Sequence, residues 1–439
     1  MSATRVLVVG GKAGIVRKAA GLGFEVVHIQ KPSAFDPDVV EHCAQLLLVD
    51  YQDVPTVTAL VRVLHEQRPI SRVFTQTEAA QAVVGHLTEA LGLPGNSART
   101  TRLLHDKPAL RALLNERGIG PVRTLTGPAH AELRDFVKAH GAAVLKPTMG
   151  SGSLGVRVIT SPDEVDGAWA WREEFGLTDF MVEELLVGDE LSVESFSAAG
   201  AHTVVALTGK ETGGGVVELG HVVPARIGDA DLASVHDMVV ALLDAVGLVD
   251  GPAHTELILT ADGPRVVESH SRRGGDRIND LVRLVHGVDL EESTYRLALE
   301  ENPVPAGPAA DGAAAIRFLV AEPGVVTSVS GVQEAEAADG VVQVDVQVAA
   351  GDTVHELRWS EDRCGYVVAR GADTGTAVRR AREAAARIVI ATEPAAGGAR
   401  PQATLGDLLE EVDEVLDPFA APRTRDGEPA TANLRRAAP

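Results

Sequence analysis

Cysteine, positive charge and long apolar runs are all scarce in this sequence. The two cysteines, Cys43 and Cys364, are far apart and offer neither a disulfide framework nor the spacing of a zinc site. The first residues lead directly into a short strand-like run without the apolar core of a signal peptide, and no stretch approaches the length of a membrane span. We therefore expect a cytoplasmic protein with no membrane partner.

The charge balance excludes a second kind of partner. The formal net charge is -22 at pH 7, which argues against binding to the phosphates of a nucleic acid. Any anion that the chain binds must be held by a local concentration of Lys, Arg and backbone N–H groups. With 439 residues, of which 45% are hydrophobic, the chain is long enough for roughly two to four globular domains.

The first 95 residues alternate between apolar runs and helical segments. Runs at 6–9, 24–29, 46–49 and 73–75 are typical of buried parallel strands, which predicts a Rossmann-like α/β domain over residues 1–95. The glycine turn at 10–14 is not a Walker A loop and is a poor dinucleotide fingerprint. A turn at the carboxyl ends of such strands can still hold part of a small substrate.

A loop of small residues follows a predicted strand at 142–145. The strand ends in Lys146, and the loop contains Gly150, Ser151, Gly152, Ser153 and Gly155 before a second strand at 156–159. Such a loop, entered by a lysine, can fold over a polyphosphate and donate backbone N–H groups to it. A flexible hairpin without a ligand is the alternative.

Carboxylates mark the next predicted strand, at 180–186. Glu183 and Glu184 lie within it, and Glu190 and Glu194 follow. A strand that ends in a chain break can offer backbone donors and acceptors to an adenine edge, and a carboxylate beyond it can accept from ribose hydroxyls. Glu190 and Glu194 could equally be the outward side of an alternating strand.

A hairpin at residues 254–270 pairs two further carboxylates. The turn at 261–264 would set Glu256 and Glu268 side by side on neighbouring strands, close to His270 and Arg272. Mg²⁺ prefers oxygen ligands and is commonly shared between carboxylates and substrate phosphates. Solvated acids on the outer face of an ordinary hairpin are the alternative interpretation.

The last third of the chain follows a proline-rich linker at 303–308. Residues 314–368 are predicted to be rich in strands and 374–391 to form one helix, while His355, Arg358 and Arg363 are expected at the surface. We place a central domain at 96–305, with a lid at about 122–185, and an α+β domain at 306–392. The remainder, 393–439, is expected to be a mostly flexible tail with an acidic helix at 405–416.

Together, these motifs resemble in order and spacing the ATP-grasp superfamily, in particular its carboxylate-amine ligases, which include dipeptide-forming L-amino acid ligases. The resemblance runs to about residue 392 and includes Lys107, which alone would be a surface charge on a helix that begins near Asn96. It implies an α/β ATP-grasp fold with an N-terminal Rossmann-like domain and a small strand-rich C-terminal domain. It also implies a homodimer formed through the N-terminal domain.

The resemblance also implies roles for the matching residues. Lys107 and Lys146 would contact the α- and β-phosphates of ATP, and the loop from Gly150 to Gly155 would close over the β- and γ-phosphates. Glu184 and Leu186 would meet adenine through their backbone, Glu183 would support its N6 side, and Glu190 would bind ribose. Glu256 and Glu268 would hold magnesium, as two ions with Glu268 shared, and Arg272 would polarise an acyl phosphate.

Two histidines are less clearly matched. His270 stands where the family has asparagine, and histidine is a softer ligand than magnesium prefers; it would bind metal weakly, tolerate manganese or only hydrogen-bond a phosphate. His221, in the run from Glu218 to Ala225, matches a Gly-His segment of amino-acid ligases near the transferred phosphate or the acceptor amine. A capping or packing histidine is the alternative.

The implied reaction is ATP-dependent amide formation between the carboxylate of an amino acid or a related compound and the amine of an amino acid. The carboxylate would attack the γ-phosphate to give an acyl phosphate and ADP, and the amine would then displace phosphate. The rival interpretations are a purine-pathway or biotin-carboxylase-like ATP-grasp enzyme, and a nucleotide-binding sensor without turnover.

Overall fold

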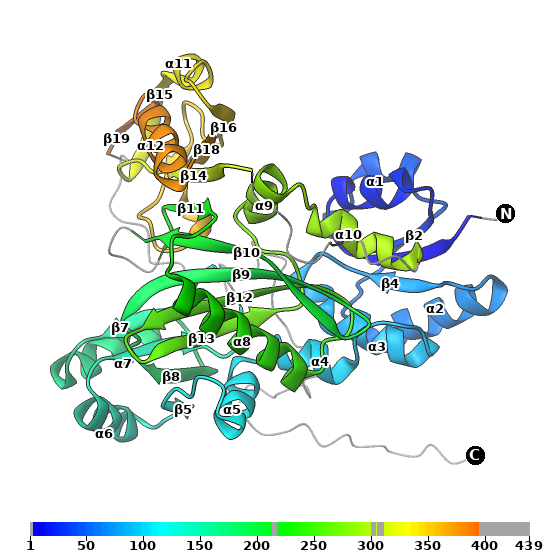
Figure 1. Ribbon diagram of the computed structural model, residues 1–439, viewed down its shortest axis with the longest axis horizontal. Helices are drawn as coiled ribbons and strands as arrows, with labels where there is room; N and C mark the ends of the chain where they lie inside the picture. The colour runs from blue at the N-terminus through cyan, green and yellow to red at the C-terminus, as the bar shows by residue number, and fades with distance from the viewer. Residues whose placement is uncertain (1–2, 151, 213–216, 300–303, 305–310, 395–439) are drawn as a thin grey trace, which may run out of the picture.

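The computed structural model describes residues 3–150, 152–212, 217–299, 304 and 311–394. Ser151, the glycines at 213–215, most of the predicted linker and the predicted helix at 405–416 lie outside the described residues. Figure 1 shows the N-terminal domain at the right, the C-terminal strands at the upper left and the lid at the lower left, around the strands β9, β10 and β12. No helix of the described part is long and apolar enough to cross a membrane.

The N-terminal domain is a parallel sheet with strand order β3-β2-β1-β4. Its strands are β1 (Arg5–Val9), β2 (Glu25–Gln30), β3 (Gln45–Leu48) and β4 (Arg72–Phe74). Its helices are α1 (Ala13–Gly21), α2 (Val54–Gln67) and α3 (Gln81–Leu91), with short 3₁₀ turns η1 (Pro32–Ala34), η2 (Pro37–His42) and η3 (Glu78–Ala80). All residues of β1 are buried, as expected for a strand covered by helices on both faces.

The helix predicted around Lys107 is two helices. Helix α4 (Ala98–Leu103) is followed by α5 (Lys107–Arg117), so Lys107 is the first residue of a helix and not a residue on a helix face. The Asp106 carboxylate accepts a hydrogen bond from the Ala109 N–H at 2.9 Å, and Pro108, which has no N–H, suits the first turn. These two residues start the second helix.

The lid is a four-stranded antiparallel sheet in the order β5-β8-β6-β7. Its elements are β5 (Thr124–Thr126), α6 (His130–His140), β6 (Ala143–Pro147), β7 (Arg157–Ile159), η4 (Pro162–Glu164), α7 (Val165–Glu174) and β8 (Phe180–Glu184). The glycine loop connects β6 to β7. Strand β6 therefore delivers Lys146 to the base of that loop.

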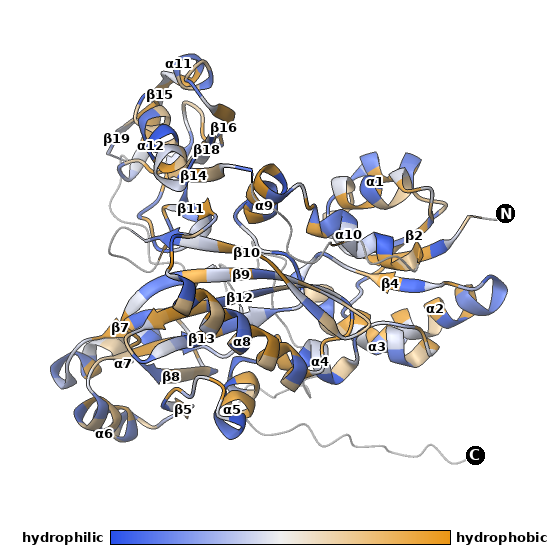
Figure 2. Cartoon of the chain, in the orientation of Figure 1, coloured by the Kyte–Doolittle hydropathy of each residue, from blue (hydrophilic) through white to orange (hydrophobic). Residues whose placement is uncertain are grey.

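The central sheet has eight strands in the order β13-β12-β9-β10-β11-β14-β18-β16, and all neighbouring pairs are antiparallel. The strands are β9 (Gly188–Ala198), β10 (Ala201–Glu211), β11 (Gly220–Val223), β12 (Gly251–Thr260), β13 (Gly263–His270), β14 (Ala313–Leu319), β16 (Val341–Val346) and β18 (Gly365–Gly371). The associated helices are α8 (Asp229–Val246), α9 (Ile278–His286) and α10 (Leu290–Arg296), with η5 at Leu297–Leu299. Figure 2 shows both hydrophobic and hydrophilic residues along α8, whose buried residues pack with those of α5, β9 and β12 in one core.

The C-terminal region does not form a sheet entirely of its own. Strands β14, β16 and β18 extend the central sheet, whereas β15 (Gly324–Ser330), β17 (Thr353–Val354) and β19 (Val389–Glu393) form a separate three-stranded sheet. The remaining elements are α11 (Val332–Glu336), η6 (Ser360–Asp362) and α12 (Thr374–Ala385). The prediction of one helix to residue 391 was wrong beyond Ala385, because the β-branched residues Val389 and Ile390 pair with β15.

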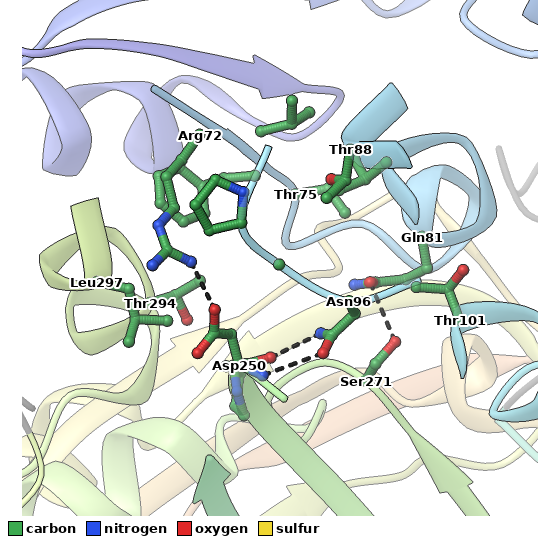
Figure 3. A pocket seen from close by; sticks show the side chains of 17 residues that line it. Arg72, Thr75, Gln81, Thr88, Asn96, Thr101, Asp250, Ser271, Thr294 and Leu297 are labelled. Carbon is green, nitrogen blue, oxygen red and sulfur yellow. Dashed lines mark hydrogen bonds and ion pairs between the residues drawn. The ribbon is translucent and has the colours of Figure 1, made fainter. Parts of the chain in front are cut away.

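A polar junction joins the N-terminal domain to the central sheet, around a small cavity of about 50 Å³. Figure 3 shows Arg72 of β4 directed at Asp250, with an Nη1 to Oδ2 distance of 2.6 Å. Asn96 donates to the Asp250 carbonyl at 2.6 Å, and Ser271 donates to Gln81 of α3 at 3.1 Å. These bonds fix the N-terminal domain against Asp250, the residue before β12, and Ser271, the residue after β13.

Candidate active site

The paired carboxylates lie opposite each other, as the hairpin pattern predicts. Glu256 of β12 is in register with Glu268 of β13. Burial works against ionisation of both, but Lys210 beside Glu256 and Lys107 beside Glu268 outweigh it. The pKa of Glu256 is lowered to about 2, and that of Glu268 lies well below its usual value. Both groups are therefore carboxylates at neutral pH, the form that binds a divalent cation.

A first cavity, of about 480 Å³, lies between the lid and this hairpin. It falls within the ~300–1,000 Å³ that small-molecule sites commonly span. Many of the predicted nucleotide residues line it: Lys107, Lys146, Gly150, Gly152, Ser153, Glu183, Glu184, Leu186, Glu190, Glu256 and Glu268. The structure thus brings these residues together, while their individual roles toward ATP stay predictions.

Gly155 has a different place from the other loop glycines. It does not line this cavity, and its φ is +72°. A Cβ there would lie 3.0 Å from Pro147 and 3.1 Å from Phe175. Gly155 therefore allows the backbone to pack closely against Pro147 and Phe175 at the end of the loop.

Glu183 pairs with two buried cations. Its carboxylate lies 2.7 Å from the Lys146 ammonium and 2.5 Å from Nε of Arg111. All three side chains are at most 7% exposed. Glu183 is therefore the counter-ion of two buried cations, and its predicted support of adenine N6 stays a prediction. Glu184 pairs instead with Arg123, whose side chain is 61% exposed.

Lys210 joins three carboxylates at the back of this cavity. Its ammonium, on a side chain only 1% exposed, lies 2.7 Å from Glu256, 3.0 Å from Glu218 and 3.1 Å from Glu190. Oxygens of these glutamates lie within 4.8 Å of one another, close enough to surround a cation. Burial opposes the charge of Lys210, but the carboxylates hold its pKa well above the usual value.

Glu194 is also internal. It is fully buried and accepts from His254 Nδ1 at 2.8 Å, and His254 Nε2 lies 3.1 Å from Glu256. Burial lowers the pKa of His254, but Glu194 and Glu256 together raise it to about 9. The outward alternative for Glu194 is therefore wrong. Glu190 is partly buried and its predicted contact with ribose stays a prediction.

A second cavity, of about 630 Å³, meets the first at Gly152, Lys210, Glu218, Glu256 and Glu268. Its wall includes Arg272, His221 and Asp276 from the central region and Lys12, Gln76 and Glu78 from the N-terminal domain. The N-terminal domain therefore contributes the carboxyl ends of β1 and β4 to this cavity, as the sequence suggests for the turn at residues 10–14.

Glu78 connects the predicted catalytic arginine to His270. Its carboxylate accepts from Nδ1 of His270 at 3.1 Å and from Nε of Arg272, and it also meets His105 at 3.0 Å. His270 Nε2 bonds to Glu268 at 3.0 Å. Burial lowers the pKa of His270, but Glu78 and Glu268 outweigh it and raise it. Both ring nitrogens are thus engaged by carboxylates, an arrangement that orients Glu268, and the predicted role of His270 as a metal ligand stays a prediction.

His221 faces Asp276 at the second cavity. The Nε2 to Oδ2 distance is 3.0 Å, and the imidazole packs edge-on against Phe318 with ring centroids 5.7 Å apart. Arg363 reaches the same carboxylate and its side chain is only 8% exposed, which corrects its expected surface position. His355 is exposed, as expected. From the sequence alone, Glu78, Arg111, Lys210 and Asp276 receive no role, because most of their partners are distant in the chain.

Three family models match consecutive parts of the chain. An ATP-grasp N-terminal domain matches residues 16–95, an ATP-grasp domain matches 140–280, and an L-amino acid ligase C-terminal domain 2 matches 317–393. The fold and the site thus define an ATP-grasp protein. Within that superfamily, the C-terminal match makes the chain similar to L-amino acid ligases, as do two of the proteins described next.

Individual relatives are distant. "Uncharacterized protein y4rH" of Sinorhizobium fredii is 28% identical over 359 residues, covering 76% of this chain and 72% of that protein. An L-arginine-specific L-amino acid ligase of Bacillus subtilis is 22% identical over 333 residues, covering 71% of this chain and 78% of the relative. The fold is similar to that of an L-amino acid ligase from Bacillus licheniformis, with a TM-score of 0.77, 20% identity, and coverage of 90% and 100% of the two chains.

Proposed function

We propose that this protein joins the carboxyl group of one amino acid, or of a related carboxylate, to the amine of another amino acid, releasing ADP and phosphate. The observation that supports this most strongly is the meeting of two cavities at Glu256, Glu268 and Lys210. One cavity carries the residues expected for ATP, and the other opens between the central sheet and the N-terminal domain. A phosphoryl group at the junction would be accessible from both.

The residues of the first cavity fit Mg-ATP. Lys107 and Lys146 would neutralise phosphate charge, and the described loop residues Gly150, Gly152 and Ser153 would cover the β- and γ-phosphates. Glu256 and Glu268, which are ionised carboxylates, would hold magnesium, as two ions with Glu268 shared. Magnesium bound there would screen the charge that develops on the transferred phosphoryl group.

The second cavity suits zwitterionic substrates, because its wall carries cations such as Lys12 and Arg273 together with anions such as Glu78 and Glu291. A carboxylate held there would attack the γ-phosphorus, forming an acyl phosphate as the bond to the ADP oxygen breaks. The amine of the second substrate would then attack the acyl carbon, expel phosphate and lose a proton. Arg272 would polarise the acyl group, and the closed loop would exclude water.

The decisive experiment is ADP and phosphate release from Mg-ATP, with the twenty amino acids offered singly and in pairs and products followed by mass spectrometry. We expect ADP release that requires two amino acids and a product lighter than their sum by one water. ADP release with a phosphorylated ribosyl amine or bicarbonate, and with no amino-acid pair, would favour a different ATP-grasp reaction. ATP binding without any turnover would favour a sensor.

A further inference from the structure

A short turn of the C-terminal region contacts both the lid and the second cavity. We call residues 359–363 the brace. Asp362 shapes it by accepting from the N–H groups of Arg358 at 2.8 Å and Trp359 at 3.2 Å. Arg363 Nε also donates to the Ser360 carbonyl at 2.6 Å. The turn is therefore built by its own hydrogen bonds, with one end toward the lid and the other toward Asp276.

The lid end of the brace is anchored by Trp359. This side chain is buried in the hydrophobic core of the lid, the cluster that includes Phe136, Phe175 and Phe180. The next residue, Ser360, donates its backbone N–H to the Gly152 carbonyl at 3.3 Å. A residue more than 170 positions away in sequence from the lid strands thus completes their core and touches the glycine loop.

The opposite end of the brace holds Asp276. Arg363 binds that carboxylate through two parallel hydrogen bonds, of 2.8 and 2.6 Å. It also donates to the Glu218 carbonyl at 3.3 Å and stacks 3.7 Å from the Phe318 ring centroid. Planar bidentate pairing of this kind fixes the orientation of a carboxylate as well as its position.

Asp276 is held in a backbone conformation that needs such support. Its φ is +49° and that of Arg277 is +63°, a left-handed region that costs non-glycine residues free energy and persists only where the surroundings impose it. Asp276 in turn bonds Nε2 of His221, whose Nδ1 is buried without a hydrogen-bond partner among the described residues. The series of contacts from Arg363 through Asp276 to His221 therefore ends in a ring nitrogen, beside the second cavity, that can still donate or accept a hydrogen bond.

We propose that the brace makes the acceptor side of the active site depend on lid position: Trp359 and Ser360 hold the lid, while Arg363 is a positioning residue that orients Asp276 and, through it, His221. This inference rests on the proposed function only where it concerns the acceptor amine. With the lid over the nucleotide, the brace sets the Asp276 carboxylate and His221 for the incoming amine. Without that contact, the acyl phosphate would form but aminolysis would be slow.

The lid half of the proposal is tested by hydrogen exchange on the full chain with magnesium and a non-hydrolysable ATP analogue. Ser360→Pro removes the N–H that bonds Gly152 and also the side-chain hydroxyl. The site is the first position of a 3₁₀ turn, where proline fits, and follows a residue in an extended conformation. We expect exchange in peptides covering 143–159 to rise by about 10-fold relative to wild type. Ser360→Ala, which keeps the N–H, is the matched control.

Trp359→Ala gives the same readout with a larger perturbation, and Trp359→Phe should retain most of the protection. If lid peptides exchange alike in wild type and in both Ser360→Pro and Trp359→Ala, the brace does not hold the lid and the proposal is wrong. This outcome is independent of substrate identity, so it also decides the lid half if no amino-acid pair reacts.

The acceptor half is tested by separating the two chemical steps. For the amino-acid pair that wild type joins, hydroxylamine captures the acyl phosphate as a hydroxamate and needs little positioning. We expect Arg363→Met to reduce amide formation by about 100-fold, and to raise KM for the acceptor, while hydroxamate formation changes by less than about 3-fold. Arg363→Lys should restore only part of the loss, because it cannot form the bidentate pair.

Arg226→Gln is the matched surface control, since Arg226 is 69% exposed and pairs with Asp373. Equal losses of amide and hydroxamate in Arg363→Met would mean that Arg363 supports the whole fold. An unchanged amide rate would mean that Arg363 contributes neither to acyl phosphate formation nor to aminolysis. Either result overturns the positioning role. Failure of wild type to join any pair would instead refute the proposed function, leaving the exchange experiment to decide the brace.

Discussion

Replacing Glu183 with glutamine should destabilise the protein strongly. The substitution keeps the shape but leaves Lys146 and Arg111 facing each other without a counter-ion, at sites only 7% and 3% exposed. Breaking a buried ion pair by removing one partner costs about 3–5 kcal/mol. At ~2–4 °C per kcal/mol for units of a few hundred residues, the melting temperature should fall by about 6–20 °C.

The assay is thermal unfolding followed by circular dichroism, with urea unfolding as a second measurement. Glu184→Gln is the matched control, because it breaks a pair with the exposed Arg123 and should cost no more than about 1 kcal/mol. Parallel binding of ATP and of inosine triphosphate, which lacks the N6 amine, tests the rival role. A Glu183→Gln protein of wild-type stability that loses its preference for ATP would refute the counter-ion interpretation.

Glu183 also bears on the charge of Lys146. Burial lowers the pKa of this lysine, and Glu183 opposes that effect. Without the carboxylate, the pKa of Lys146 should fall further, so that less of the lysine is charged as pH rises. ATP affinity of the variant should therefore decrease from pH 6 to pH 9 more steeply than that of wild type, as measured by calorimetric titration.

Three further predictions concern separate parts of the molecule. Glu268→Gln should abolish ADP formation while leaving the circular dichroism spectrum intact, and near-normal turnover would remove the metal assignment. Arg272→Lys should lower kcat by about 100-fold, because lysine cannot bond Glu78 and still hold a positive charge where the guanidinium lies. A rate within about 3-fold of wild type would contradict this expectation. Burial lowers the pKa of His28 in β2 despite its bond to the Val8 carbonyl. The stability linked to the neutral imidazole is therefore present above the unfolded pKa of about 6.5 and lost as pH falls below it. In His28→Phe, the free energy of unfolding measured with urea should change less between pH 7 and pH 5 than in wild type.

Local chemistry explains what the sequence could predict. The pairing of Glu256 with Glu268 follows from a tight turn and strand alternation within fifteen residues, and the N-terminal parallel sheet follows from continuous apolar runs. The sequence pattern predicts one helix from near Asn96 through Lys107, whereas Asp106 and Pro108 are a recognisable start of a second helix.

The contacts between distant segments could not be predicted in this way. Glu78 meets His270 across 192 positions and Arg111 meets Glu183 across 72. An isolated glutamate or arginine in a helical segment has the same pattern whether it is buried with a partner or exposed to solvent. Arg363 is the clearest case, since composition alone favours the surface, whereas its contacts with Asp276 and Phe318, both distant in sequence, bury it.

The shared sheet has a consequence for exchanging C-terminal regions among ligases of this group. Strand β11 is bonded to β10 on one side and to β14 on the other, with His221 opposite Ile316. A chimera joined in the linker before β14 would therefore place a foreign strand directly beside His221, and a truncation there would expose β11 as an open edge prone to association with other chains. Recombination should succeed best where the crossover keeps β11 and β14 from the same parent.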